Sequence, residues 1–324
     1  MLTMAIACAA LTAAIGPDGA AAATAGRVMA GSYANSAGTL AYEAFVPDSV
    51  GGEGGKRVPL VVALHGCTQT AAGFRALTRL DELAAKRGFV VVFPEQPKSR
   101  NQLGCWNWFQ QDHMQRGAGE PSMIAGITNE VLQRYPIDPD RVYVTGLSAG
   151  GAMASVMGAT YPDLFAAIGV AAGCEYAAGA ACAGYKGTDP EQSARAAYQA
   201  MGSLARPVPF IVFQGDKDKT VPPENADQLV QSGQAIADWA DDGARNSSIP
   251  ARPSRTSAGW NQGGRSYTLR HYKDGHGHEL AQYWMVHGME HAWSGGDATQ
   301  PYADPAGPDA TAAMYDFFMD HAKR

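Results

Sequence analysis

The sequence predicts an α/β fold in which a mostly parallel central sheet has helices on both faces. Short apolar runs typical of strands alternate with segments whose apolar residues recur at helical spacing. The runs 60–64, 89–93 and 210–213 are apolar at every position, as expected for strands buried on both faces. Because no repeat and no shift in composition divides the chain, we expect a single catalytic domain over residues 26–324.

Composition is compatible with a sizeable core and argues against one class of partner. Hydrophobic residues make up 46% of the 324 residues, and the formal net charge is −6. Lysines and arginines are scattered and form no basic run, so we expect no nucleic-acid partner.

The first 25 residues resemble a secretory signal peptide. Residues 4–15 are apolar and rich in alanine, and Ala23-Thr24-Ala25 has the small-x-small pattern of a cleavage site. No Lys or Arg precedes the apolar run, which is unusual for such a leader. The run is too short to span a bilayer, so we expect a mature chain without an integral membrane segment, secreted to the periplasm or the medium.

Four cysteines remain once residues 1–25 are removed: Cys67, Cys105, Cys174 and Cys182. An even number in an exported chain predicts two disulfides. Cys174 and Cys182 would close a short local loop, which leaves Cys67 to pair with Cys105. The alternative is four buried free thiols in a cytosolic protein.

Strands and helices are expected in alternation along the chain. Residues 26–34 look like a lead-in, and the Gly-rich segment 48–57 predicts a turn. Strands are expected at 39–46, 60–64, 89–93, 142–145, 165–171, 210–213, 266–272 and 283–286. Helices with one apolar face are expected at 73–87, 122–135, 225–240 and 309–321, and a further helix follows residue 150. Segments 99–121 and 241–255 read as loops, and the alanine-rich segment 177–206 as a lid or cap.

A candidate nucleophile lies in the pentapeptide Gly146-Leu147-Ser148-Ala149-Gly150. It stands between a predicted strand and a predicted helix, the context that a G-x-S-x-G nucleophile elbow requires. The glycines permit a tight turn, which presents the Ser148 hydroxyl at a helix N-terminus. The same letters can arise by chance in a glycine-rich chain, but the flanking strand and helix favour the elbow.

A serine hydroxyl needs a base to take its proton, and the base needs a carboxylate to orient it. In this architecture the carboxylate follows a buried strand, and the segment after 210–213 offers Asp216 and Asp218. We favour Asp218, because the chain then has room to turn before the acid is presented. Asp216 reads as a turn former.

The candidate base is His291, in a glycine-bounded loop after the last predicted strand. His287, at the strand end, has the position of a structural histidine. His276 and His278 lie in a hairpin-like turn at the opposite end of that strand. Together with Glu279 they offer metal-binding groups without a fixed ligand spacing, so we expect no metal there.

The loop Leu64-His65-Gly66-Cys67 completes the predicted site. In elbow enzymes this loop supplies one N–H of the oxyanion hole, and the residue after the nucleophile supplies the other. We therefore predict the backbone amides of Cys67 and Ala149 as the donors. His65 is expected to pack beneath the loop.

The chain resembles the esterase family of secreted polyhydroxybutyrate depolymerases, within the α/β-hydrolases. The segments that match are 64–69, 105–109, 146–153, 215–221 and 288–293. The resemblance implies a triad of Ser148, Asp218 and His291, with Cys67 in the oxyanion hole. The sequence departs from the family pattern at Gln214, a position where family members commonly have histidine.

The expected activity is hydrolysis of carboxylic esters, with poly- or oligo(3-hydroxybutyrate) as the favoured substrate and no cofactor. Alternatives are feruloyl or acetyl esters of plant polysaccharide, a serine peptidase on the same fold, and an inactive polymer-binding relative. Trp106, Trp108 and Trp293 are candidates to line the substrate groove, with ordinary packing as the alternative. The sequence leaves the oligomeric state open.

Overall fold

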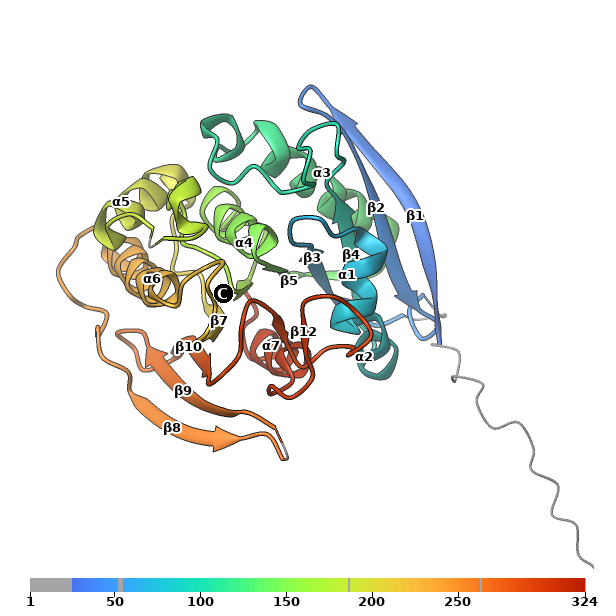
Figure 1. The fold of residues 1–324 in the computed structure, drawn as a ribbon. Helices are drawn as coiled ribbons and strands as arrows, with labels where there is room; N and C mark the ends of the chain where they lie inside the picture. The colour runs from blue at the N-terminus through green and yellow to red at the C-terminus, as the bar shows by residue number, and fades with distance from the viewer. Residues whose placement is uncertain (1–24, 52–54, 186, 263, 324) are drawn as a thin grey trace, which may run out of the picture.

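A ten-stranded sheet runs through the protein in the order β1-β2-β4-β3-β5-β6-β7-β10-β9-β8 (Figure 1). The computed structural model describes residues 25–51, 55–185, 187–262 and 264–323, so the expected leader lies almost entirely outside the described residues. The strands are β1 (Gly26–Asn35), β2 (Gly38–Pro47), β3 (Val58–Leu64), β4 (Val90–Glu95), β5 (Ile137–Leu147), β6 (Ala167–Ala171), β7 (Phe210–Gly215), β8 (Arg255–Trp260), β9 (Ser266–Lys273) and β10 (Glu279–Val286). A separate short pair joins β11 (Trp293–Ser294) to β12 (Ala303–Asp304).

The six central strands, from β4 to β10 in the sheet order, all pair in parallel. The outer strands β1 and β2 at one edge, and β9 and β8 at the other, pair antiparallel. The predicted mostly parallel α/β-hydrolase fold is confirmed. Because the central strands share a direction, the loops after them meet along one edge of the sheet.

Helices cover both faces of the sheet (Figure 1). They are α1 (Ala71–Thr78), α2 (Leu80–Arg87), α3 (Gly119–Arg134), α4 (Ala149–Thr160), α5 (Pro190–Met201), α6 (Glu224–Asp242) and α7 (Ala310–Met319), with single 3-10 turns η1 (Gln111–His113), η2 (Ala180–Cys182) and η3 (Gly202–Leu204). Buried residues of α3, α4, α5 and α6 join one core cluster, and those of α1, α2 and α7 join the other.

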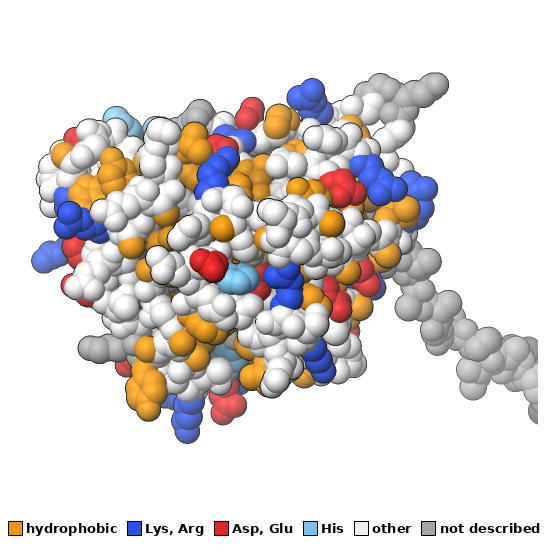
Figure 2. Space-filling model, turned by 90° about the horizontal axis from the view of Figure 1, so that it is seen from above, with side chains coloured by type: hydrophobic (Ala, Val, Ile, Leu, Met, Phe, Trp, Pro, Cys, Tyr) orange, Lys and Arg blue, Asp and Glu red, His pale blue; other side chains and the backbone are white. Residues whose placement is uncertain are grey.

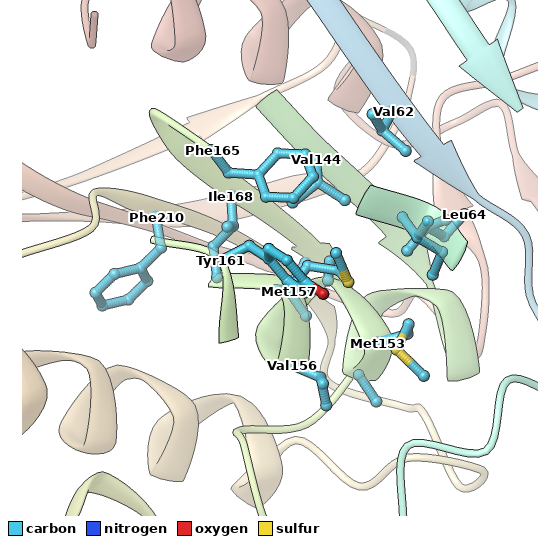
Figure 3. Close-up of a cluster of buried hydrophobic side chains, with 14 of the residues drawn as sticks. Val62, Leu64, Val144, Met153, Val156, Met157, Tyr161, Phe165, Ile168 and Phe210 are labelled. Carbon is cyan, nitrogen blue, oxygen red and sulfur yellow. The ribbon is translucent and has the colours of Figure 1, made fainter. Parts of the chain in front are cut away.

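Strand β3 explains why the predicted buried strands are apolar throughout. Leu60, Val62 and Leu64 pack in the core beneath α4, whereas Val61 and Ala63 pack in the core on the opposite face. Successive side chains of a strand point to opposite faces, so both sets must be apolar when both faces are covered. Figure 3 shows the first of these cores, where methionines of α4 meet valine and leucine side chains of the sheet.

Three sequence predictions differ from the structure. The lead-in 26–34 is strand β1. Strand β8 (Arg255–Trp260) begins at the last residue of the segment 241–255 that is interpreted as a loop from the sequence, and residues 256–260 have no predicted structure. Both are edge strands whose exposed side chains need not be apolar, so the composition gave no signal. The single helix expected at 73–87 is two helices, because Arg79 adopts φ 55 and breaks the helix between α1 and α2.

The turn between β5 and α4 has the strained backbone expected of an elbow. Ser148 adopts φ 57 and ψ −120, a conformation that non-glycine residues rarely take. A Cβ on Gly150 would collide with the Leu64 carbonyl, and one on Gly146 would collide with the backbone of Gly150. Glycine is therefore required on both sides of Ser148 to let α4 approach the sheet.

We predict that Gly150→Ala destabilises the protein by roughly 2–4 kcal/mol, because the backbone of Leu64 and His65 must shift to admit a methyl group. Thermal unfolding followed by circular dichroism measures the effect. Gly158→Ala is the matched control in the same helix. There the added Cβ meets only side-chain atoms of Ile168, the nearest at 3.1 Å, so the variant should unfold within a few degrees of the parent. Equal melting temperatures for the two variants would contradict the packing argument.

Two disulfides pair as the sequence predicts, Cys67 with Cys105 and Cys174 with Cys182. The first ties the loop after β3 to the long loop after β4. The second joins two cysteines that lie eight positions apart in the segment after β6. Both therefore hold loops at the edge of the sheet where the central strands end.

Glu175, next to the second disulfide, carries a buried carboxylate. Its side chain is 3% exposed, and neither carboxylate oxygen has a hydrogen-bond partner among the described residues. It borders a small cavity of about 50 Å³ between β6, α4, α5 and α6. Burial raises the pKa of the Glu175 carboxyl from an ordinary 4.5 to about 7.

A raised pKa in the folded state means that folding favours the protonated carboxyl. The contribution of Glu175 to folding stability is therefore fully present below about pH 4.5 and is lost as the pH rises towards 7. We predict that Glu175→Gln is more stable than the parent by roughly 1–3 kcal/mol at pH 8, with little difference at pH 4.5. Urea unfolding of both proteins at the two pH values tests this. A difference that does not grow with pH would contradict it.

Candidate active site

A cavity of about 180 Å³ opens at the edge of the sheet where the central strands end. Its lining includes all the residues predicted for the nucleophile, the base and the oxyanion hole. The lining residues are Gly66, Cys67, Gln69, Trp108, Leu147, Ser148, Ala149, Ala152, Cys174, Cys182, Ala183, Thr220, Val221, His291 and Tyr302. Most of this surface is apolar, which suits the acyl part of an uncharged ester.

Asp218 and His291 form the best-defined polar contact of the cavity. His291 Nδ1 lies 2.7 Å from Asp218 Oδ2, and Asp218 is 3% exposed. Backbone N–H groups of Thr220 and Val221 donate to Oδ1 of Asp218 at 2.8 and 2.9 Å. Gln214 Nε2 donates to Oδ2 at 3.3 Å. Three donors thus fix the carboxylate, which in turn holds the His291 ring by one nitrogen.

The other ring nitrogen of His291 has no hydrogen-bond partner among the described residues. The His291 ring lines the cavity together with Ser148. The hydrogen bonds of the described residues include none between the Ser148 hydroxyl and the His291 ring. Catalytic hydrogen bonds of this kind are often long in the absence of substrate and tighten when it binds. Ser148 and the His291 ring therefore line the same small cavity without a direct hydrogen bond between them in the described residues.

Asp216 does more than form a turn. Its Oδ1 accepts the Gly288 N–H at 2.7 Å, and its Oδ2 lies 3.1 Å from His287 Nδ1. The remaining nitrogen of His287 lies 2.9 Å from the Thr268 hydroxyl. This second Asp–His pair joins the loop that carries Asp218 to the loop that carries His291, and it does not line the cavity.

The two predicted oxyanion donors lie beside Ser148 on the cavity wall. Ala149 is the first residue of α4, so its N–H has no partner within the helix. No hydrogen bond from the Cys67 N–H is recorded within the described residues. The side chain of Gln69 accepts the neighbouring Gly66 N–H at 2.8 Å, which fixes the loop without using the Cys67 amide.

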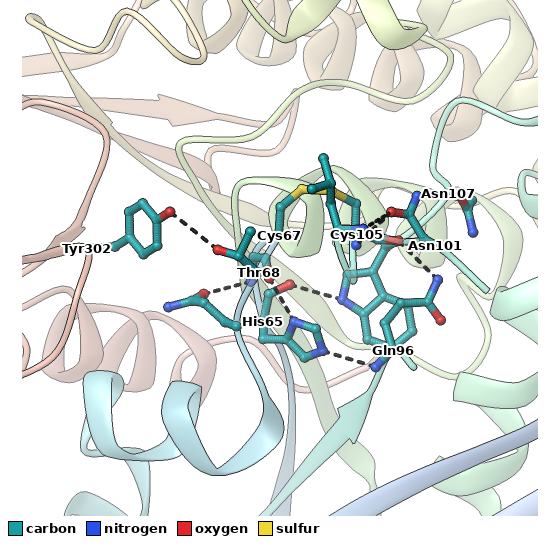
Figure 4. The surroundings of a disulfide bond; sticks show 12 residues. His65, Cys67, Thr68, Gln96, Asn101, Cys105, Asn107 and Tyr302 are labelled. Carbon is teal, nitrogen blue, oxygen red and sulfur yellow. Dashed lines mark hydrogen bonds between the residues drawn. A yellow bond between two sulfur atoms is a disulfide. The ribbon is translucent and has the colours of Figure 1, made fainter. Parts of the chain in front are cut away.

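His65 supports this loop from beneath (Figure 4). It is fully buried, with Nδ1 2.8 Å from the Gly66 carbonyl, and Nε2 accepts the Gln96 N–H at 3.0 Å. Burial lowers the pKa of His65, which keeps the ring neutral and is consistent with one nitrogen donating and the other accepting. Both ring nitrogens are occupied, so His65 is a structural residue, as predicted.

A buried acid that the sequence analysis did not single out organises the neighbouring loop. Glu120, at the start of α3, is fully buried and accepts the backbone N–H of Asn107 at 2.7 Å and its side-chain amide at 2.6 Å. Gln96 also donates to Glu120. These contacts hold the segment between Cys105 and Trp108 against the cavity, and no local motif around Glu120 signals them.

Two of the three tryptophans predicted to line the groove do not line the cavity. Trp106 is fully buried, and its indole N–H donates to the His65 carbonyl at 3.0 Å. Trp293 is also fully buried, packs edge-on against Phe74, and donates to the Thr311 hydroxyl at 3.0 Å. A buried indole with its N–H satisfied serves packing, so these two predictions are wrong. Trp108 does line the cavity.

Tyr302 is a lining residue that the sequence analysis missed. It is 41% exposed, lies edge-on to the His291 ring with ring centroids 6.3 Å apart, and contacts the Thr68 hydroxyl at 3.4 Å (Figure 4). It belongs to a segment without strand or helix periodicity, which gave no signal in the sequence.

Other binding features are sparse in the part of the chain that the structure describes. No group of three or more His, Cys, Asp or Glu side chains there is arranged to hold a metal ion. None of its helices is both long and apolar enough to cross a membrane. Acidic and basic side chains are mixed on the face shown in Figure 2, with apolar side chains between them.

Several known proteins are similar to this chain in sequence or in fold. Residues 40–248 match the family described as "Esterase PHB depolymerase". Poly(3-hydroxyalkanoate) depolymerase C of Paucimonas lemoignei is 41% identical over 183 residues, which are 53% of this chain and 44% of the relative. A probable acetylxylan esterase A of Aspergillus fumigatus is 33% identical over 205 residues, 59% of this chain and 53% of the relative. The chain thus spans about half the length of these curated relatives.

Among solved structures, the acetyl xylan esterase from Aspergillus awamori superposes with a TM-score of 0.66 at 26% identity, covering 82% of this chain and 94% of that one. A feruloyl esterase module from Clostridium thermocellum, at 14% identity and a TM-score of 0.57, shares the fold. The family match ends before His291, so it does not cover the candidate base, which the structure places 2.7 Å from Asp218. Since the match spans more than half of the sequence, the chain belongs to the esterase PHB depolymerase family.

Proposed function

We propose that the protein is a serine hydrolase of carboxylic esters and that Ser148, His291 and Asp218 are its catalytic triad. The observation that carries the proposal is the buried Asp218–His291 contact of 2.7 Å at the wall of the cavity that also contains Ser148. The chain order of nucleophile, acid and base is that of α/β-hydrolases. Membership of the esterase PHB depolymerase family supports the same chemistry.

The reaction proceeds in two steps. Ser148 Oγ attacks the ester carbonyl while His291 takes the hydroxyl proton, and Asp218 stabilises the imidazolium that forms. The amides of Cys67 and Ala149 donate to the oxyanion of the tetrahedral intermediate. His291 then gives the proton to the departing alcohol, which leaves an acyl-Ser148 ester. Water attacks this ester with His291 as base and releases the carboxylic acid, and Ser148 recovers its proton.

The favoured substrate is a poly- or oligo(3-hydroxybutyrate)-type polyester. The depolymerase of Paucimonas lemoignei has the highest identity among the relatives described above. The apolar wall formed by Trp108, Leu147 and Val221 suits a short aliphatic acyl group. The second candidate is an acetyl or feruloyl ester of plant polysaccharide, which the acetylxylan esterase relatives and the Aspergillus awamori structure favour.

We further propose that residues 26–324 form one catalytic domain that is exported after cleavage of residues 1–25. The two disulfides support an oxidising destination, because such bonds rarely persist in the cytosol. Mass spectrometry of the protein recovered from the culture medium or the periplasm would give the mature N-terminus directly.

We predict that Ser148→Ala abolishes turnover of p-nitrophenyl butyrate without changing the circular dichroism spectrum. Asp218→Asn should lower kcat by about 10³–10⁴-fold, because the wrong imidazole tautomer is then favoured. Asp216→Asn is the matched control two positions away in the same loop. It retains the acceptor for the Gly288 N–H and should cost less than about tenfold. A larger loss in Asp216→Asn than in Asp218→Asn would reverse the assignment of the acid.

The substrate proposal predicts a rank order of kcat/KM. Soluble 3-hydroxybutyrate oligomers should exceed methyl ferulate and acetylated xylan, because the cavity of about 180 Å³ is small and mainly apolar. Rates on the three substrates, with p-nitrophenyl butyrate as a common reference, provide the measurement. A preference for acetylated xylan would replace the first candidate with the second, and activity only on peptide amides would refute ester hydrolysis as the main reaction.

A further inference from the structure

A second groove, separate from the catalytic cavity, lies between α7 and the outer strands of the sheet. We call it the α7 groove. One wall is made by aromatic side chains of β8, β9 and β10, namely Trp260, Tyr267 and Trp284. The other wall is made by α7 and its flanks, with Asp309, Asp316 and Asp320. Its volume of about 400 Å³ exceeds that of the catalytic cavity, and the two share no lining residue.

The aromatic wall is held rigidly before any ligand binds. Trp284 stacks on the buried Phe213, with planes 9° apart, and its indole N–H donates to Gln282 at 3.1 Å. Tyr267 packs against Trp284 with ring centroids 4.9 Å apart, and its ring covers Gly259 of the next strand. Aromatic rings with few free rotamers lose little entropy when a ligand covers them.

Trp260 extends this wall into solvent. It is 64% exposed, whereas the other tryptophans of the chain are buried or half-buried. It ends β8, and the adjoining Asn261 is anchored by its side-chain amide to the Gly307 carbonyl at 2.9 Å. The strand end that positions Trp260 is therefore fixed to the segment that leads into α7.

The opposite wall supplies hydrogen-bond acceptors. Asp309, Asp316 and Asp320 are exposed, and none forms a salt bridge within the described residues. Asp309 uses one oxygen to cap α7 at Ala312 N, which leaves the other free. Eleven positions of α7 and its flanks separate the first acid from the third, roughly 16 Å at the rise of an α-helix. The groove is therefore elongated, with acceptors along its length.

Aromatic faces opposite a row of oxygen acceptors match the chemistry of a neutral polysaccharide. A sugar ring offers an apolar C–H face to stack on indole and phenol rings, and hydroxyl groups that donate to carboxylates. A polyester has no hydrogen-bond donor, so covering these carboxylates with it would strip them of water without compensation. A polyanion would be repelled by three unpaired acids.

The groove is also placed to serve the catalytic cavity. The segment from Tyr302 to Pro308, which includes β12, borders both the cavity and the groove, because Tyr302 lines the catalytic cavity and Pro308 lines the α7 groove. Figure 1 shows α7 beside β10, the strand that carries Trp284, and β12 on the other side of α7. A chain bound along α7 can thus continue over this segment towards Ser148.

We propose that the α7 groove is a binding site for a neutral polysaccharide, which holds the protein on a glycan-containing surface near its ester substrate. The site acts in binding, and its occupancy does not depend on which ester the catalytic cavity cleaves. Trp260 supplies the main stacking surface, and the acids on α7 accept sugar hydroxyls.

Affinity electrophoresis of the full chain in gels with soluble β-1,4-xylan, hydroxyethyl cellulose or galactomannan tests the proposal. We expect at least one polysaccharide to retard the parent protein and Trp260→Ala to weaken its binding about fivefold or more. Tyr185→Ala is the matched control, because Tyr185 is 74% exposed and lies outside the groove, and its retardation should equal that of the parent. Turnover of p-nitrophenyl butyrate by Trp260→Ala should be unchanged, which separates this site from catalysis.

A second variant identifies the class of ligand. Asp316→Asn combined with Asp320→Asn keeps an oxygen acceptor at each position, so polysaccharide binding should change less than about threefold. Unretarded migration of the parent in all three gels would overturn the proposal. So would Trp260-dependent binding of hexalysine or of amorphous poly(3-hydroxybutyrate) in place of the polysaccharides.

Discussion

The contact between Asp218 and His291 is the constraint on which the proposed chemistry depends. It joins side chains 73 positions apart, from the loops after β7 and β10. These two strands are parallel neighbours in the sheet, so their loops leave the same edge side by side. The Asp216–His287 pair ties the same loops together a few residues away. Strand pairing thus brings the loops after β7 and β10 close together, and the two Asp–His pairs fix how the side chains of these loops are placed.

The nucleophile side of the cavity is built by a different set of forces. Tight packing of Gly146 and Gly150 against backbone forces Ser148 into its strained conformation at the start of α4. The loop that carries Cys67 is held from below by His65 and from the side by the disulfide to Cys105. In the proposed mechanism a rigid amide at Cys67 matters, because oxyanion stabilisation requires donors that are already in place.

The sequence was sufficient for the features that follow from buried strands. Runs such as 210–213, apolar at every position, predicted a parallel sheet, and the polar residues after them predicted Asp218 and the loop of His291. It was insufficient where a side chain's partner lies far along the chain. Trp106 and Trp293 looked like groove residues because tryptophan is common in binding sites, but buried acceptors satisfy both indole groups. Glu120 and Tyr302 carry no local pattern, and edge strands β1 and β8 need no apolar face.

Labelling with a fluorophosphonate provides the most direct test of the proposed triad, because the probe reacts only with a serine that a neighbouring base activates. The labelled protein would be digested and the modified peptide identified by mass spectrometry. The account predicts one adduct per chain, on Ser148, and a loss of labelling in His291→Ala that retains the parent circular dichroism spectrum. Labelling of Ser148 at an unchanged rate without His291, or an adduct on another serine, would contradict it.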